Sequence, residues 1–486
     1  MPKAGLAVKV EEAHREIPPP DFGIVYDLPA LIDLAQRRNP ATRIAWEVAR
    51  AAAAGVGLAE AQYYPSLALL ASYGGGYWDL DVETRADLSA LGRRDDALGA
   101  LLAGAGEKTL NLDVAAGFTR GSASANLRWL LFDFGAREAV VEVAEKNLSV
   151  ANLTFDATHQ LVAFAVVEAF SFWQATADHE RATEVSLEAA RVVEEAAEAR
   201  YRLGKLTEPD LLQARSEAVA ADYARERARA ESEVAYVKLA QVTGLPPGTE
   251  LLIARLDVSH LPASLEVPLQ EFIDRALAQR PDLLARAAAL EAREASLRRS
   301  RAAALPRIGM LGVAGWSQMN NSIRKVPALD DLDFNLQRYA AFLTFEWAIF
   351  DGFARMNTQR MAGAALAAAE AKLEEARDKA IAEVWRDYVK ARNAIARRKS
   401  VESLVAAANT RFASALEGFN QGLVDMPTLV LARAARAQAE RARAESDAAL
   451  LSSLAHLALG AGEMSESFLE AGRKLERSPG ALYSDW

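Results

Sequence analysis

The side chains that most often carry chemistry are few and scattered in this sequence. The five histidines (His14, His159, His179, His260 and His456) lie far apart and form no HExxH motif, and the chain contains no cysteine. The composition excludes thiol nucleophiles, thiolate zinc sites, iron–sulfur clusters and disulfides, and the histidines offer no ligand set for metal catalysis. We therefore expect no enzymatic activity, no metal and no cofactor.

Two glycine-rich segments have only a superficial likeness to phosphate loops. Residues 104–109 read GAGEKT, but the pattern GxxxxGK[ST] requires glycine where Leu102 and Glu107 stand. Gly74–Gly76 has neither a lysine nor a helix after it. The balance of 56 Lys and Arg against 66 Asp and Glu, a net charge of −10, also argues against nucleic acid as a partner.

The elements that would position any functional residue occur twice. Pro40 and Pro65 align with Pro281 and Pro306 at an offset of 241. A second offset, 218, relates Trp129–Arg137 to Trp347–Arg355, Gly204 to Gly422, Pro209 to Pro427 and Gly244 to Gly462. Matched Pro, Gly and Trp at constant offsets indicate an internal duplication rather than chance alignment.

Each half contains a predicted β-hairpin, over residues 64–134 and 305–352. Polar and apolar residues alternate for about ten residues before each Phe-Asp pair, which is the length of a tilted transmembrane strand. The predicted polar face, a candidate barrel lumen, consists of Ser122, Ser124, Asn126, Arg128, Thr344 and Glu346. The predicted lipid-facing or belt residues are Leu127, Trp129, Leu343, Phe345 and Trp347.

Alternatives remain open for these strands. A half-buried sheet of a soluble protein has the same alternation, and Arg128 and Glu346 either line a lumen or form a salt bridge with each other. Residues 80–115 are placed at the cell surface, with a short helix near residues 88–102.

Long helices are predicted after each hairpin, over residues 135–203 and 354–421. At about 100 Å they are far longer than ordinary globular helices, so they are expected to form coiled coils. A second helix starts at Pro209 or Pro427 and runs to about residue 242 or 459. Shorter helices over 41–62 and 282–304 are expected to stack end to end on these return helices.

The predicted fold class is mainly α with a four-stranded β portion, internally duplicated, in which coiled-coil helical hairpins join a contribution to a transmembrane β-barrel. The expected domains are an extended N-terminal segment (1–27), repeat 1 (28–244, with its helical tip at 204–209), an equatorial linker (245–267), repeat 2 (268–462, with its tip at 422–427) and a C-terminal tail (463–486).

Membrane insertion, if it occurs, is expected to use strands. Residues 161–173 form the longest apolar run, but it is short and contains Glu168, and residues 1–20 contain no signal-peptide-like run. Four strands cannot close a barrel, and an open edge in lipid leaves backbone groups unpaired. Several copies must therefore share one barrel, and the composition alone does not choose between two, three or four.

The duplicated motifs resemble the TolC-type outer-membrane efflux family. They are the helix break at Arg38–Pro40, the segment Tyr63–Leu67, the segment Trp129–Gly135 and the turn Tyr201–Gly204, within residues 28–462. The resemblance implies an outer-membrane homotrimer with a twelve-stranded barrel in lipid and a hollow helical barrel in the periplasm. It also implies a passive exit duct in tripartite efflux or type I secretion, with a periplasmic adaptor (membrane fusion) protein and an inner-membrane pump of the resistance-nodulation-division, ABC or a similar class.

The helical tips carry the remaining candidate residues. Adaptor docking is assigned to Gly204, Leu206, Pro209, Gly422, Leu423 and Pro427, and a pore-entrance ring to Glu208, Asp210 and Asp425. Alternatively, these acidic residues only stabilise helix N-termini. The rival function is a soluble coiled-coil scaffold with a small β cap, and the cargo of a duct is not readable from the sequence.

Overall fold

The computed structural model describes residues 22–87, 107–246, 248–257, 261–324 and 332–464. These residues form two compact units. The helical unit takes the described residues of 1–56, 142–295 and 363–486, and the sheet unit takes those of 57–141 and 296–362. Of the predicted segments, the helix near 88–102, most of the N-terminal segment and most of the C-terminal tail lie outside the described residues.

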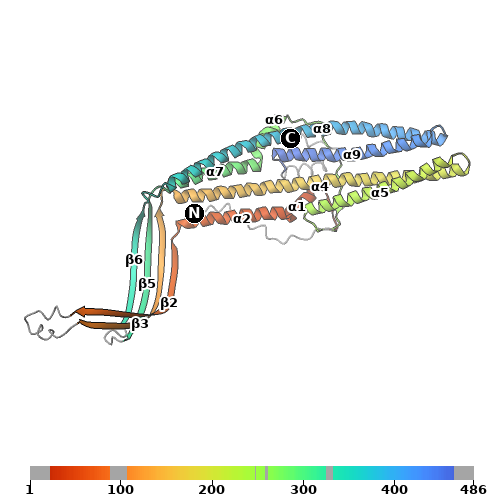
Figure 1. Ribbon diagram of the computed structural model, residues 1–486. Coiled ribbons are helices and arrows are strands. Elements are labelled where there is room, and N and C mark those ends of the chain that lie inside the picture. The colour runs from red at the N-terminus through yellow and green to blue at the C-terminus, as the bar shows by residue number, and fades with distance from the viewer. Residues whose placement is uncertain (1–21, 88–106, 247, 258–260, 325–331, 465–486) are drawn as a thin grey trace, which may run out of the picture. The chain divides into compact units, whose positions relative to one another are not determined.

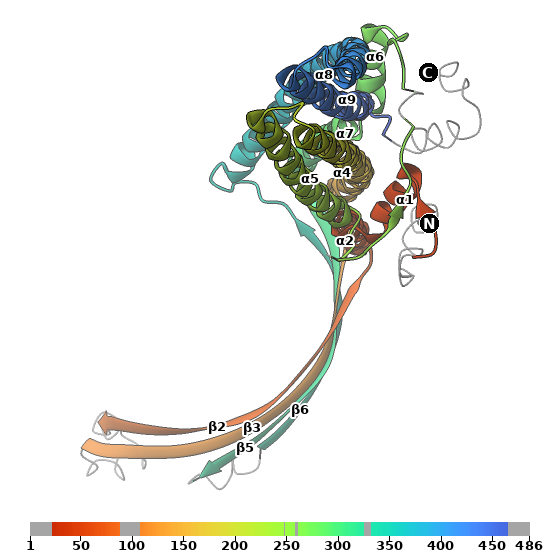
Figure 2. The same ribbon diagram turned by 90° about the vertical axis from the view of Figure 1, so that its right-hand side faces the viewer.

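Two helical hairpins lie side by side in the helical unit (Figures 1 and 2). In the first, α4 (Ala136–Arg202) is followed by α5 (Glu208–Val242), and in the second α8 (Ala354–Gln421) is followed by α9 (Met426–Ala461). The predicted bounds of the long helices are confirmed to within one residue. Buried positions of α8 recur at spacings of three and four, the periodicity of a coiled-coil seam, on either side of one gap between Ala394 and Val405: Val384, Asp387, Ala391, Ala394, Val405, Ala408, Phe412, Ala415 and Phe419.

The shorter helices meet the return helices end to end. Helix α1 (Leu28–Arg38) breaks into α2 (Pro40–Glu60), and α6 (Leu269–Gln279) breaks into α7 (Pro281–Ala302). Gly244, which follows α5, lies so close to the first break that a Cβ atom there would be 2.9 Å from the Arg38 carbonyl. Gly462, which follows α9, lies equally close to the second break, 3.0 Å from the Arg280 nitrogen. The predicted end-to-end stacking is confirmed.

A buried cluster joins α1 to α4, α5 and α9. Leu31 and Ile32 of α1 pack there with Val166 and Phe170 of α4. The N-terminal segment and the linker each add a short strand, β1 (Val25–Tyr26) and β4 (Leu252–Ile253), which pair in parallel. By composition alone α4 is also long and apolar enough to cross a membrane, with 28% of the qualifying window buried. A single such helix is weak evidence, and α4 uses apolar residues in this cluster.

The sheet unit contains one antiparallel sheet with the strand order β2-β3-β5-β6. The strands are β2 (Ser66–Asp87), β3 (Glu107–Phe132), β5 (Arg307–Arg324) and β6 (Leu332–Glu346). With 22, 26, 18 and 15 residues they exceed the predicted ten, so the predicted strand length was wrong, and β2 and β3 extend into the segment 80–115 that we placed at the cell surface. The prediction failed because backbone pairing continues through Gly74–Gly76 and Gly121, where side-chain alternation is lost.

Candidate functional site

The sheet has one predominantly apolar face. Residues directly opposite each other in a ladder point to the same side, and Trp129 is opposite Met310, which is opposite Leu343. Leu127 and Phe345 share this face by the same register, and both Leu343 and Phe345 are exposed. Trp347 follows the end of β6 rather than lying within it. Four of the five predicted lipid-facing or belt residues therefore lie on one face.

The other face carries the six predicted lumen residues but is mixed in character. Ser122, Ser124, Asn126 and Arg128 follow one another along β3, and the Ser122 hydroxyl bonds Ser72 of β2 at 2.8 Å. On β5 and β6, however, Leu311, Val313 and Phe342 lie on the same side, in register with Asn126 and Arg128. The alternation read on β3 therefore does not describe all four strands.

The possible salt bridge between Arg128 and Glu346 does not form within the chain. Arg128 on β3 lies opposite Leu311 of β5, whereas Glu346 on β6 lies opposite Arg307 of β5. The two groups are on strands that are not neighbours, so each is free to face the same space.

A buried arginine fixes the passage from β3 into α4. Arg137 donates to the carbonyls of Leu130 at 2.6 Å and Leu131 at 3.0 Å, and its own N–H donates to Asp133 Oδ2 at 2.8 Å. Its guanidinium carbon lies 4.7 Å from the centre of the Tyr63 ring. These contacts satisfy the last strand carbonyls where the chain reverses through the left-handed residues Phe134 and Gly135.

The passage from β6 into α8 repeats this arrangement. Arg355 donates to Asp351 Oδ2 at 2.8 Å and to the Ala304 carbonyl at 3.2 Å. The Trp347 indole also donates to that carbonyl, at 3.2 Å, as the Trp129 indole donates to Tyr63 at 3.0 Å. The order of the left-handed pair is reversed here, with Gly352 before Phe353.

At the helical tips, the acidic residues lie at the N-termini of the return helices, and Asp425 is itself a helix cap. Thr207 caps α5, with Glu208 and Asp210 in the first turn. Asp425 caps α9 and accepts a hydrogen bond from the Thr428 N–H at 3.1 Å. Hydrogen bonds from the Thr428 side chain and N–H hold the pKa of Asp425 below its usual range. The prolines lie one position later than predicted, because Glu208 and Met426 occupy the first helical positions.

The tip turns leave small and apolar residues exposed. Gly204 and Gly422 have positive φ angles of 66° and 78°, and nothing lies within 4 Å of an added Cβ atom at either. Leu423 is 77% exposed beside Gly422. Leu206, by contrast, packs partly into the buried tip cluster of Leu211, Phe419 and Met426.

Two arginines that we did not predict connect the hairpins near their tips. Arg200 of α4 donates to the last carbonyls of α8, those of Phe419 at 3.0 Å and Asn420 at 3.1 Å. Arg433 of α9 pairs with Glu217 of α5 at 2.7 Å. Arg433 aligns with Arg215 at the offset of 218, but nothing in the sequence indicated its partner Glu217.

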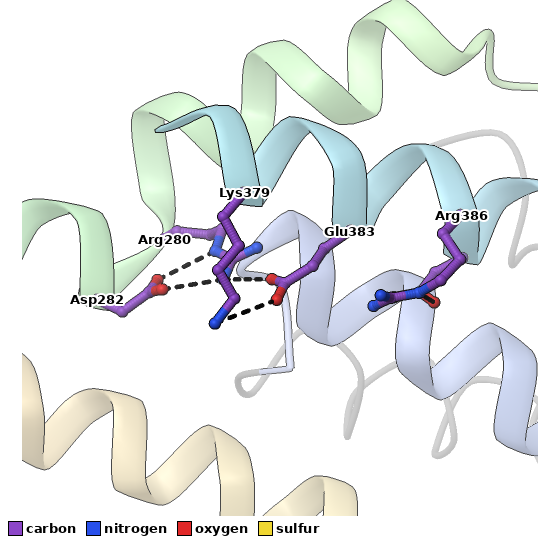
Figure 3. A network of polar contacts seen from close by, with 6 residues as sticks. Arg280, Asp282, Lys379, Glu383 and Arg386 are labelled. Carbon is purple, nitrogen blue, oxygen red and sulfur yellow. Dashed lines mark hydrogen bonds and ion pairs between the residues drawn. The ribbon is translucent and has the colours of Figure 1, made fainter. Parts of the chain in front are cut away.

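An ion-pair network lies at the break between α6 and α7 (Figure 3). Arg280 Nη2 lies 2.9 Å from both Asp282 Oδ2 and Glu383 Oε2, and Lys379 Nζ lies 3.9 Å from Glu383 Oε1. Burial alone would raise the pKa of Asp282, but the hydrogen bond and positive charge of Arg280 outweigh it and lower that pKa. Within the described parts of the chain, no group of three or more His, Asp or Glu residues could hold a metal ion.

The described residues thus form two helical hairpins in one unit and a four-stranded antiparallel sheet in the other, and comparison with known proteins identifies the class of protein to which they belong. The sequence profile described as outer membrane efflux protein matches residues 31–245 and 272–463. A curated relative, protein CyaE of Bordetella pertussis, is 30% identical over 380 residues, which are 77% of this chain and 72% of CyaE. The chain therefore belongs to the outer membrane efflux protein family.

Solved structures share the fold. CusC superposes with a TM-score of 0.70 at 17% identity, covering 93% of this chain and 96% of CusC. The outer membrane protein VceC of Vibrio cholerae superposes with a TM-score of 0.64 at 18% identity, covering 90% and 96% of the two chains. Family membership confirms two predictions: the protein is an outer-membrane efflux channel with a helical periplasmic part, and it is not an enzyme. The alternative of a soluble scaffold is not retained.

Proposed function

We propose that three copies of this chain form one passive exit duct, with the twelve strands closing a single barrel in the outer membrane. The observation that carries the proposal is the open sheet, whose outer strands β2 and β6 each have one unpaired edge. Unpaired backbone groups in lipid cost several kcal/mol each, so the edges require partners. A head-to-tail ring, in which β6 of one copy pairs with β2 of the next, supplies them all.

The equivalence of the two junctions supports an internal duplication into repeats 28–244 and 268–462, joined by the linker 245–267. Asp133 and Arg137 make the same backbone contact as Asp351 and Arg355, at the offset of 218 found in the sequence. Each repeat contributes one hairpin to the barrel. In this arrangement the face with Arg128 and Glu346 lines the lumen and the opposite face meets lipid.

The tips are the proposed docking site for a periplasmic adaptor protein, which connects the duct to an inner-membrane pump. Open space around Gly204 and Gly422 would let an adaptor helix approach the backbone closely. The Asp425 carboxylate caps α9 but remains exposed to solvent. In a trimer, three such carboxylates would form a ring of negative charge at the pore entrance.

Disulfide cross-linking tests the ring directly, because the chain has no cysteine of its own. Ala68 of β2 and Phe342 of β6 lie at similar levels of the sheet, within the register that links all four strands. The double variant Ala68→Cys, Phe342→Cys in outer membranes should oxidise to a covalent trimer, whereas each single variant stays monomeric on denaturing gels. A ladder that stops at dimers, or cross-linking confined to single chains, would contradict the ring.

Docking is tested by replacing both tip glycines with tryptophan, which should abolish efflux while trimers persist. The matched control replaces both with alanine, which shares the backbone strain of positive φ but adds little bulk. Unimpaired efflux in the tryptophan variant, or equal loss in both variants, would refute docking through the tips.

A further inference from the structure

A row of exposed basic side chains follows one face of α8 in the helical unit. It consists of Lys379, Arg386, Lys390, Arg397 and Arg411, and we call it the α8 basic face. The side chains of Lys379, Arg386 and Lys390 are 76%, 58% and 54% exposed. Such a row is unexpected in a chain with a net charge of −10.

The α8 basic face points away from α6. Ile381 and Tyr388 of α8 belong to the cluster that packs on α6, and the Tyr388 ring lies 6.1 Å from that of Phe272. Nine residues are two and a half helical turns, so Lys390 lies diametrically opposite Ile381, and Lys379 and Arg397 lie opposite Tyr388. Figure 3 shows Lys379 extending from α8 on the side away from the α6 ribbon.

The helical layer has a covered side, on which α1, α6 and the linker pack, and a free side opposite to it. Figure 2 shows α1 and α6 on the same side of the two hairpins. Tyr236 of α5 bonds the linker on that side, through Thr249 and Leu251. If copies of the chain close into a tube, these extra elements would block it from within, so the free side is the one that can line an open duct.

The other helices contribute little net charge to the free side. Arg227 of α5 lies nine residues before Tyr236 and pairs with Glu231 at 3.0 Å. Glu445 of α9 lies nine residues before Leu454, which packs in the α6 cluster, and it pairs with Arg441 at 2.9 Å. Each pair is neutral, and the exposed Lys238 of α5, two residues after Tyr236, adds one further positive charge to the free side.

Acidic residues on α4 and α8 do not cancel the α8 basic face. Glu168 lies on the free side of α4, among neutral residues such as Phe172. On α8, the exposed Glu375 lies one turn before Lys379 and offsets one positive charge. By contrast, Glu383 is shared with Arg280, and the buried Asp387 is shared by Arg386 and Lys390. Arg397 and Arg411 remain as exposed cations that add to the excess.

From this charge distribution we infer that the duct wall is cationic along α8 and that the protein favours anionic cargo, such as acidic polypeptides or small organic anions. The inference rests on the proposed function, because the free side becomes a lumen only when copies of the chain form a tube. Threefold repetition would place three such rows around one water-filled space. Their field reaches about 10 Å at 0.1 M salt, so it should bias transit while leaving water-filled passage open.

Ion selectivity of the full-length protein in planar lipid bilayers tests this inference, with potassium chloride gradients at low total salt as the probe. The proposed acidic entrance at Asp425 is the same in every variant, so the change in the chloride-to-potassium permeability ratio, rather than its absolute value, reports the charge of the α8 wall. The triple variant Lys379→Gln, Arg397→Gln, Arg411→Gln should lower the chloride-to-potassium permeability ratio by about twofold or more, since it removes nine wall charges per trimer. It spares Arg386 and Lys390, so Asp387 keeps its partners.

The matched control is Arg377→Gln, Arg392→Gln, Lys399→Gln, which removes the same charge from the α6 side of the same helix. Arg377 and Lys399 are eleven residues, about three turns, from Tyr388, and Arg392 is eleven from Ile381. This variant should keep wild-type selectivity. Should the first triple variant fail to assemble, Arg397→Glu alone changes the wall charge by two per chain and should lower the ratio.

The outcomes separate the two proposals. A permeability ratio that responds equally to both triple variants, or to neither, would overturn the cationic wall while leaving the duct intact. If the wild-type protein forms no pores at all, the proposed function itself is contradicted, and the inference falls with it.

Discussion

The end-to-end joint between α5 and the α1–α2 break makes a quantitative prediction about Gly244. Gly244 and Gly204 both have positive φ angles, 73° and 66°, so alanine pays the same left-handed backbone cost at each, about 1–2 kcal/mol. At Gly204 the added Cβ meets nothing within 4 Å. At Gly244 it would lie 2.9 Å from both the carbonyl carbon and the oxygen of Arg38, which belong to rigid backbone.

The difference in stability between Gly244→Ala and Gly204→Ala measures the cost of the steric overlap at the end-to-end joint. Relieving such an overlap by backbone shifts typically costs about 1–3 kcal/mol beyond the shared strain. The unfolding entropy of a 486-residue chain is about 1 kcal/mol per kelvin, so Gly244→Ala should unfold about 1–3 °C lower than Gly204→Ala.

The assay is thermal unfolding of the detergent-solubilised protein, followed by circular dichroism at identical scan rates. Gly462→Ala and Gly422→Ala provide an independent pair, because only Gly462 contacts a helix break, at Arg280. Equal unfolding temperatures within both pairs would refute the argument that the return helices abut α2 and α7 through these glycines.

Three further predictions concern single side chains. Arg200→Gln removes a cation that bonds the last carbonyls of α8, worth about 1–3 kcal/mol, and should speed hydrogen exchange around residues 415–425 without altering trimer yield; unchanged exchange would refute the role. Arg137→Lys should lower the free energy of unfolding by about 2–5 kcal/mol, because two buried strand carbonyls lose their donor. The loss should exceed that of Arg355→Lys, because the Arg355 side chain is more exposed and bonds only one carbonyl. The reverse order would contradict this comparison. His179 has a pKa lowered by burial and by Arg441, and also by Arg227, against Glu231 and Glu445. Since the unfolded chain binds the proton more readily, stability should fall as pH drops below about 6.5, and His179→Gln should flatten that part of the stability profile.

Local pattern was enough to define the helices and turns. Apolar residues at spacings of three and four indicate the coiled-coil seam of α8 in the sequence. A glycine with a positive φ angle follows each of the four helices of the hairpins. The Trp-Asp-Arg spacing of the strand–helix junctions was also visible as a repeated block, although the part played by Arg137 was not. These features depend on interactions between residues that are close in the sequence, so a short stretch of sequence is enough to predict them.

The strands were harder to predict because their length depends on partners rather than on side chains. Residues such as Gly74–Gly76 lack alternation, yet each pairs with β3 because the ladder is formed by backbone groups. The mixed character of the polar face has the same origin. Leu311 and Phe342 join Arg128 on one side only through the register of three strands, which no single segment specifies.

The sequence by itself determined the order of the strand hairpins and helical hairpins along the chain, the bounds of the long helices and the absence of thiol chemistry. Only the tertiary structure decided which charges meet across helices, such as Arg280 with Glu383, and which side of α8 is covered by α6. A helical wheel shows that Lys379 and Tyr388 lie on opposite faces, but not which of them packs. That choice depends on contacts between segments more than a hundred residues apart. A short stretch of sequence does not specify such contacts.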